Sequence, residues 1–224
     1  MKKFILILLL PCLFMGCPAG KKEIEGKVIV KIGDSVVTTE DFEAAFEITK
    51  LGYSHNYVLK NLSELKEDVL AQLIEEELIL DYASKKGVEY TNEEFINDLE
   101  EVKKEYPDNV FEEILKNNSI ETAVFQKRFK REMALKKALS SIINKNIEVD
   151  EKDLRSVFLK YCKANDLNSE DVKNNNEIAE IVLDTVKRLT IQADYDSLLE
   201  ELKKTIEINI VKENWADVLK EGRL

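Results

Sequence analysis

Apolar residues recur along most of the chain at intervals of three and four, the spacing of an α-helix. The strongest such pattern is Ser63–Lys86, and Gly87 directly after two lysines is typical of a helix end. Thr91 and Glu94 predict a capping box for the next helix, which Pro107 ends. Further helices are predicted at about 39–48, 110–116, 119–145, 151–163 and 177–204. We expect Thr38 or Thr39 to cap the helix at 39–48, Ser119 the helix at 119–145, and Asp150 the helix at 151–163.

Two segments near the ends of the chain have the pattern of β-strands instead. Lys27–Thr38 reads KVIVKIGDSVVT, in which two β-branched runs flank Gly33–Asp34, and this predicts a hairpin. Thr205–Val211 reads TIEINIV and alternates like a strand. Because a lone strand is marginally stable, we expect it to pair with Val28–Ile32 or with Val36–Val37. The predicted fold is mainly α with a small β-sheet, in which the N-terminal hairpin pairs with a C-terminal strand.

Composition narrows the possible functions. The 224 residues include 33 Lys and Arg against 44 Asp and Glu, a net charge of −11, and this acidic balance disfavours a nucleic-acid partner. No glycine-rich phosphate loop is visible among seven glycines, so we expect no nucleotide. One histidine disfavours a histidine-based metal site or catalytic triad. We therefore predict no catalytic residue, no metal, no cofactor and no enzyme activity.

The N-terminus is typical of an exported protein. Two lysines precede the apolar run Phe4–Phe14, which as a helix reaches about 16 Å, half of what a membrane span needs. We interpret residues 1–16 as a signal peptide. Gly16–Cys17 resembles a bacterial lipobox, which predicts lipid attachment at Cys17 and a lipidated tether over 17–26. The alternative is an ordinary signal peptide cleaved near Ala19. Pro18 after the cysteine favours the outer membrane, facing the periplasm.

The remaining cysteine and the single histidine are weak candidates for a reactive or metal-binding residue. Cys12 leaves with the signal peptide and Cys17 is modified, so Cys162 has no partner for a disulfide. Cys162 lies on an apolar helix face and is interpreted as a small buried residue, with a reactive nucleophile as the alternative. His55 lies in a loose connection over 52–61 and is interpreted as a surface or half-packed side chain rather than a ligand.

The helix predicted at 119–145 differs from the others because its apolar residues cover an arc of about 220°, wider than the stripe of a surface helix. It also carries six cations, at positions 127, 128, 130, 131, 136 and 137. The favoured interpretation is ion pairing with the acidic segments Glu75–Glu77 and Glu93–Glu105. The alternative is binding of a client protein or of lipid.

Four segments together resemble the chaperone part of the SurA and PrsA family of exported foldases. They are GDSVVTTEDF, LKEDVLAQLIEEELILDYASKKGVEYTNEEF, ETAVFQKRFKREMALKKAL and IEVDEKDL. The resemblance runs over about 28–161 and returns weakly at 195–210. It implies a helical lobe like those of SurA and trigger factor over 27–163, a polar linker over 164–176, and a closing helix and strand over 177–224 that pack back on the lobe.

The chain departs from the family where most members carry a parvulin prolyl-isomerase domain. Only the polar run after Cys162 occupies that place, and it contains no histidine. A catalytic domain of about a hundred residues cannot fit there. We therefore expect no prolyl-isomerase activity.

The resemblance implies an ATP-independent holdase for unfolded or nascent exported proteins, including outer-membrane proteins, anchored to the membrane by lipid. Clients would bind to an apolar cradle between the N-terminal lobe and the closing helix. The candidate client-binding residues are Tyr53, Tyr57, Phe125, Phe129 and Met133. An adaptor lipoprotein that holds one specific partner is the alternative, and a prolyl isomerase is the least favoured function.

Overall fold

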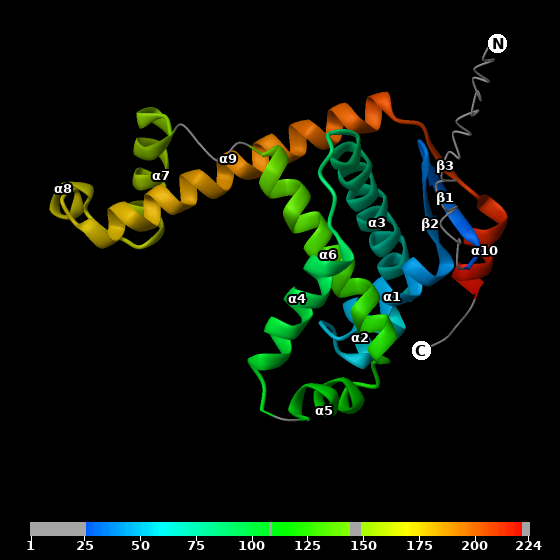
Figure 1. Cartoon of the computed structure of the whole chain (residues 1–224). Helices are drawn as coiled ribbons and strands as arrows, with labels where there is room; N and C mark the ends of the chain where they lie inside the picture. The colour runs from blue at the N-terminus through cyan, green and yellow to red at the C-terminus, as the bar shows by residue number, and fades with distance from the viewer. Residues whose placement is uncertain (1–25, 108, 144–148, 221–224) are drawn as a thin grey trace, which may run out of the picture.

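A computed structural model describes residues 26–107, 109–143 and 149–220. In chain order the elements are β1 (Val28–Ile32), β2 (Ser35–Thr38), α1 (Thr39–Lys50), α2 (His55–Lys60), α3 (Leu62–Lys85), α4 (Asn92–Lys104), α5 (Val110–Asn117), α6 (Thr122–Ile142), α7 (Glu151–Ala164), α8 (Ser169–Val172), α9 (Asn176–Thr205), β3 (Ile208–Ile210) and α10 (Lys212–Lys220). The predicted mainly-α fold with a small sheet is confirmed (Figure 1). The predicted signal peptide, Cys17 and all of the tether except Gly26 lie outside the described residues.

The sheet joins the two ends of the described chain. Its order is β2-β1-β3 and both pairings are antiparallel, so β1 is the central strand. Val30 pairs with Val37 on one side and with Ile210 on the other. Gly33 has a φ of +54°, the left-handed conformation that the predicted hairpin turn requires, and its amide donates to the Glu207 carbonyl at 3.0 Å. The expected pairing of the C-terminal strand with the hairpin is therefore confirmed.

We call β1–β3, α1, α3, α6 and α10 the body. Its core lies where α1 and α3 pack against the sheet, and its largest fully buried side chains are Ile29, Ile32, Leu73, Leu78 and Ile79. Thr38 begins α1 with a capping box, in which its hydroxyl accepts from the Asp41 amide and its own amide donates to the Asp41 carboxylate. The body therefore contains the continuous hydrophobic core of the protein.

The sequence did not predict α10, which attaches the C-terminal end of the described chain to the body. The Asn214 amide group donates to the Val28 carbonyl at 2.7 Å, and Trp215 packs edge-on against Phe42 with ring centroids 5.3 Å apart. Lys66 of α3, which is buried, donates to the Val218 carbonyl at 2.6 Å. These contacts fix α10 against β1, α1 and the start of α3.

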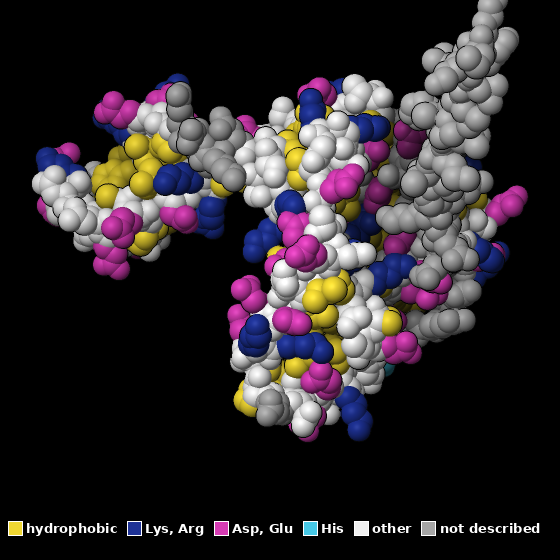
Figure 2. Space-filling view, in the orientation of Figure 1, with side chains coloured by type: hydrophobic (Ala, Val, Ile, Leu, Met, Phe, Trp, Pro, Cys, Tyr) yellow, Lys and Arg dark blue, Asp and Glu magenta, His cyan; other side chains and the backbone are white. Residues whose placement is uncertain are grey.

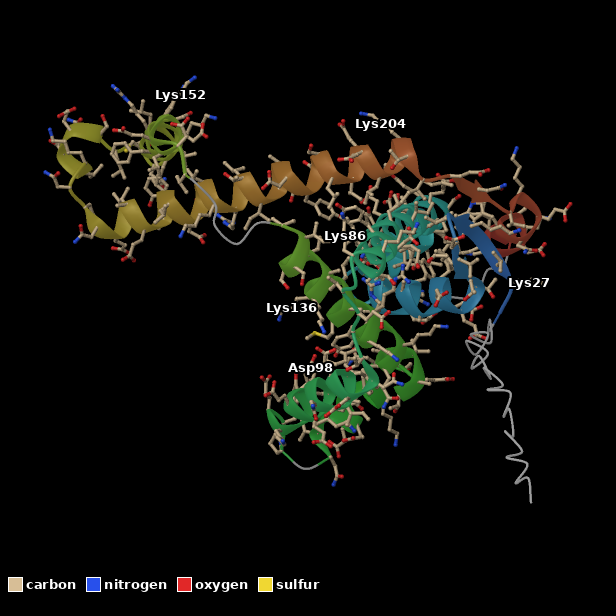
Figure 3. The ribbon with its side chains drawn as sticks, turned by 45° about the horizontal axis from the view of Figure 1, so that its top comes forward. Lys27, Lys86, Asp98, Lys136, Lys152 and Lys204 are labelled. Carbon is tan, nitrogen blue, oxygen red and sulfur yellow. The ribbon has the colours of Figure 1, made fainter. Side chains whose placement is uncertain are left out.

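Two projections leave the body (Figures 1 and 3). The first, which we call the α4–α5 lobe, contains α4 and α5, which pack against the N-terminal part of α6; Asp98 marks it in Figure 3. The second, which we call the arm, contains α7, α8 and the first half of α9; Lys152 marks it. α7 packs on α9 (Figure 1), so this last helix of the predicted 27–163 lobe belongs to the arm.

The long helix α9 changes its buried face along its length. Ile178, Val182 and Val186 are buried in the arm, whereas Leu199 and Leu202 are buried against the body. One unbroken helix therefore connects the arm to the body.

Three local predictions are corrected. The connection at 52–61, expected to be loose, contains the short helix α2, which Ser54 caps. Ser119 does not cap α6, because Glu121 is the N-cap residue; Ser119 instead follows α5 with a φ of +57°. The polar run at 164–176 contains α8 at the tip of the arm.

Candidate functional site

The basic helix α6 uses two arginines to hold α3. Arg128 donates two hydrogen bonds to the Glu76 carboxylate, both at 2.8 Å, and Arg131 reaches Glu76 at 2.7 Å and Glu77 at 2.9 Å. The Glu76 side chain is only 4% exposed. Burial alone would raise the pKa of Glu76, but the hydrogen bonds and charges of both arginines outweigh it and hold the pKa below its usual 4.5.

Other α6 cations pair with α1 and α4. Lys127 lies 3.2 Å from Asp41 and 3.4 Å from Glu40. Lys137 binds Glu94 of α4, and this hydrogen bond is the main cause that lowers the pKa of Glu94 to about 2. The favoured interpretation, ion pairing of the cationic strip with Glu75–Glu77 and Glu93–Glu105, is confirmed for Arg128, Arg131 and Lys137. These side chains join α6 to three neighbouring helices.

The predicted client-binding residues Tyr53 and Tyr57 lie on the surface. They are 45% and 46% exposed and stack on each other with centroids 4.9 Å apart and planes 10° from parallel. Ser54 caps α2 between them by accepting from the Tyr57 amide, which fixes the local backbone. The pair is therefore a preformed aromatic surface, because stacking already orients both rings.

Phe125, Phe129 and Met133 are half-buried on α6. Phe125 and Phe129 stack at 5.7 Å and belong to a run of ring contacts that joins α4, α5 and α6 in the order Tyr106, Phe111, Phe125, Phe129, Phe95. Among the described rings, no contact connects this run to the tyrosine pair. The two phenylalanines thus form part of the packing of the α4–α5 lobe.

Further exposed apolar residues, which the sequence did not single out, lie beside the tyrosine pair, on the α4–α5 lobe and on the arm. They include Leu51 and Leu59 beside the tyrosines, Ile96 and Ile114 on the α4–α5 lobe, and Leu159, Leu167, Ile181, Leu183 and Leu189 on the arm. Figure 2 shows hydrophobic side chains on the arm and on the α4–α5 lobe. Leu189 continues the α9 face that packs on α7, and it is 58% exposed. Leu189 could have been identified from the sequence, because it continues the apolar stripe of that helix face.

A cleft of about 570 Å³ opens beside α1. Its walls come from α1, α10, the start of α3 and the turn between α5 and α6, and its lining includes Phe42, Phe46, Ile120, Val124 and Val218. Sequence reasoning missed this cleft because one wall is the unpredicted helix α10.

The remaining candidate chemistry can be placed on the structure. Cys162 is buried and free, in agreement with its interpretation as a small packed residue, and His55 is exposed at the start of α2. Within the described residues, no cluster of His, Cys, Asp or Glu is arranged to hold a metal ion. No helix in the described part is long and apolar enough to cross a membrane.

Comparison with known families assigns the N-terminal part of the chain. Residues 1–139 match the family described as SurA-like N-terminal domain, which covers the described β1, β2 and α1 to α5 and most of α6. The chain belongs to the SurA-like N-terminal domain family. That domain is a non-catalytic chaperone module, so the family is of the chaperone type. The arm and α10 follow the matched residues. No curated protein matches the chain.

Proposed function

We propose that this SurA-like protein is an ATP-independent holdase for unfolded exported proteins, including outer-membrane proteins. It would be anchored through Cys17 to the periplasmic side of a membrane, the outer membrane being favoured. The observation that carries the proposal is the distribution of exposed apolar side chains over three separate places: the tyrosine pair, the α4–α5 lobe and the arm.

Separated apolar sites suit an unfolded client. A single exposed apolar residue is ordinary on a protein surface, so no one contact indicates binding. An extended chain of a few dozen residues, however, can touch several sites at once, and each additional contact then forms at a high effective concentration. Weak contacts at distant places on the surface would together retain the client, and each would release without ATP.

Among the predicted residues, the tyrosine pair is best placed to bind a client. Both rings are nearly half exposed, and their stacking lowers the entropy that each loses on binding. Phe125, Phe129 and Met133 are half-buried, so we propose a smaller part for them, at the edge of the aromatic run.

The test is suppression of aggregation of an unfolded outer-membrane protein. We expect the protein in several-fold excess to suppress aggregation, and we expect Tyr53→Ser with Tyr57→Ser to raise the required amount about fivefold, which corresponds to ~1 kcal/mol. Asn56→Ser with Lys60→Ser changes two exposed residues of α2 and is the matched control.

Two results would contradict the holdase. One is wild-type protein that leaves aggregation unchanged at several-fold excess. The other is a single saturable complex with one partner and no binding to unrelated unfolded chains, which would identify an adaptor instead.

A further inference from the structure

The cleft beside α1 is lined by apolar and acidic side chains. Phe42 and Phe46 belong to its lining but are only 2% and 4% exposed, so the accessible apolar side is made by half-buried Ile120 and Val124 of the α5–α6 turn and the start of α6. Its volume of about 570 Å³ lies within the range of about 300–1,000 Å³ that is typical of binding pockets. The cleft therefore has room for a few side chains of a bound segment.

The lining of the cleft carries more negative than positive side chains. The lining contains four carboxylates, Glu43, Glu47, Glu121 and Asp217, and two ammonium groups, Lys27 and Lys66. Asp217 pairs with Lys27 at 3.3 Å, and Glu47 pairs with Lys50 at 2.8 Å. Glu43 and Glu121 are exposed, and neither forms an ion pair with another described residue. Two carboxylates at the rim are thus available to a cation from outside.

The rim also contains an unfavourable backbone conformation. Ser119 closes the C-terminal end of α5, where its amide donates to Lys116 and the next amide donates to Leu115. This position normally takes glycine because it needs a positive φ, and Ser119 adopts +57° with a β-carbon. Ser119 is also one of the residues that line the cleft. A strained residue at a pocket is consistent with a functional role for its side chain.

We infer that this cleft binds a segment of an unfolded client in which an apolar side chain lies next to lysine or arginine. The apolar side chain packs on Ile120 and Val124, and the neighbouring cation lies against Glu43 and Glu121. This inference rests on the proposed holdase function, because it assumes an unfolded client. It adds to that function a site that selects clients by their charge.

The test uses two short fluorescent peptides of equal length, in which phenylalanine and leucine alternate with arginine in one and with glutamate in the other. We expect the purified protein to bind the arginine peptide at least about tenfold more tightly. Glu43→Gln with Glu121→Gln should remove about tenfold of that affinity, because two partly exposed ion pairs are lost. Glu100→Gln with Glu101→Gln makes the same change of charge on exposed α4 positions and should have no effect.

The outcomes separate this inference from the proposed function. Equal binding of both peptides, or equal loss in both double variants, would overturn the charge-selective cleft, while suppression of aggregation would still support the holdase. Binding that appears only when the residues before Gly26 are removed would show that the chain itself fills the cleft and would overturn the inference. Selective peptide binding without any suppression of aggregation would retain the cleft and reject the holdase.

Discussion

The body and the arm bury apolar surface in different ways. In the body, α1 and α3 cover a sheet, and eight large side chains are less than 2% exposed, among them Ile32 and Leu73. In the arm, two helices pack along one seam whose buried residues are Cys162, Ile178, Val182 and Val186. A two-helix seam leaves most of each helix in solvent, which explains why exposed leucines such as Leu183 gather there. The body is built for stability, and the arm keeps apolar surface accessible.

The electrostatics of the two regions also differ. The body contains the Glu76, Arg128 and Arg131 cluster, whose side chains are 4%, 10% and 15% exposed. In the arm the ion pairs are at the surface: Arg188 and Asp184 are about 70% exposed, where such a pair contributes little. Substitutions that each remove one interaction should therefore lower the free energy of unfolding most in the body.

The largest effect should come from a cavity in the core of the body. Leu73 is fully buried, so Leu73→Ala should lower the free energy of unfolding by about 3 kcal/mol, because it removes apolar contacts and leaves a void. Leu183→Ala makes the same change at a 37% exposed position in the arm and should cost less than about 0.5 kcal/mol. Urea unfolding measures both. Equal losses would show that the arm is part of the same core.

A smaller effect is expected from the ionic cluster. Glu76→Gln should cost roughly 2 kcal/mol, below the range of about 3–5 kcal/mol for a fully buried pair, because Arg128 keeps Glu132 and Arg131 keeps Glu77. The folded-state pKa of Glu76 is below its usual 4.5, so its contribution is complete above pH 4.5 and is lost as pH falls through the folded value. Unfolding at pH 7 and at pH 3 measures this difference.

The control for the cluster is Glu200→Gln, at an exposed pair with Lys204. Its effect at pH 7 should be close to zero. A gap between wild type and Glu76→Gln that stays constant from pH 7 to pH 3 would contradict the proposed role of the Glu76 carboxylate.

The smallest effect on global stability is expected in the arm. Val182→Ala removes two methyl groups from the α7–α9 seam and should weaken it by about 1.5 kcal/mol. Because the arm has its own small core, opening should be local, with faster amide exchange over 151–189 and unchanged exchange in α3. Exchange that rises equally in both regions would show that the arm and the body unfold together.

Helices with strong caps were predicted well. Thr38, Thr91 and Asp150 each accept a hydrogen bond from a backbone amide as their spacing implies, and α1, α4 and α7 begin directly after them. The sheet followed from its alternating pattern and from the need of a lone strand for a neighbour. These signals are local, so the sequence carries them without tertiary information.

The missed features depend on tertiary contacts. α10 is held by distant groups, including the Val28 carbonyl and Phe42, which no local pattern reveals. Ser119 resembles a cap in sequence, but its role is decided by how α5 ends. The candidate site divides in the same way, since the exposure of Tyr53 and Tyr57 could be anticipated from a polar segment, whereas the cleft requires three separate parts of the chain to meet.

The order of strands also has a consequence for the timing of synthesis. β1 is the middle strand, and its second neighbour β3 comes after all of the helices α1 to α9 in the chain. Until Ile210 emerges, one edge of β1 keeps unpaired amide and carbonyl groups. The hairpin and α1 can form early, but the sheet closes only after α1 to α9 have been made, so a fragment that ends before β3 should remain vulnerable to proteases even when its helices are complete.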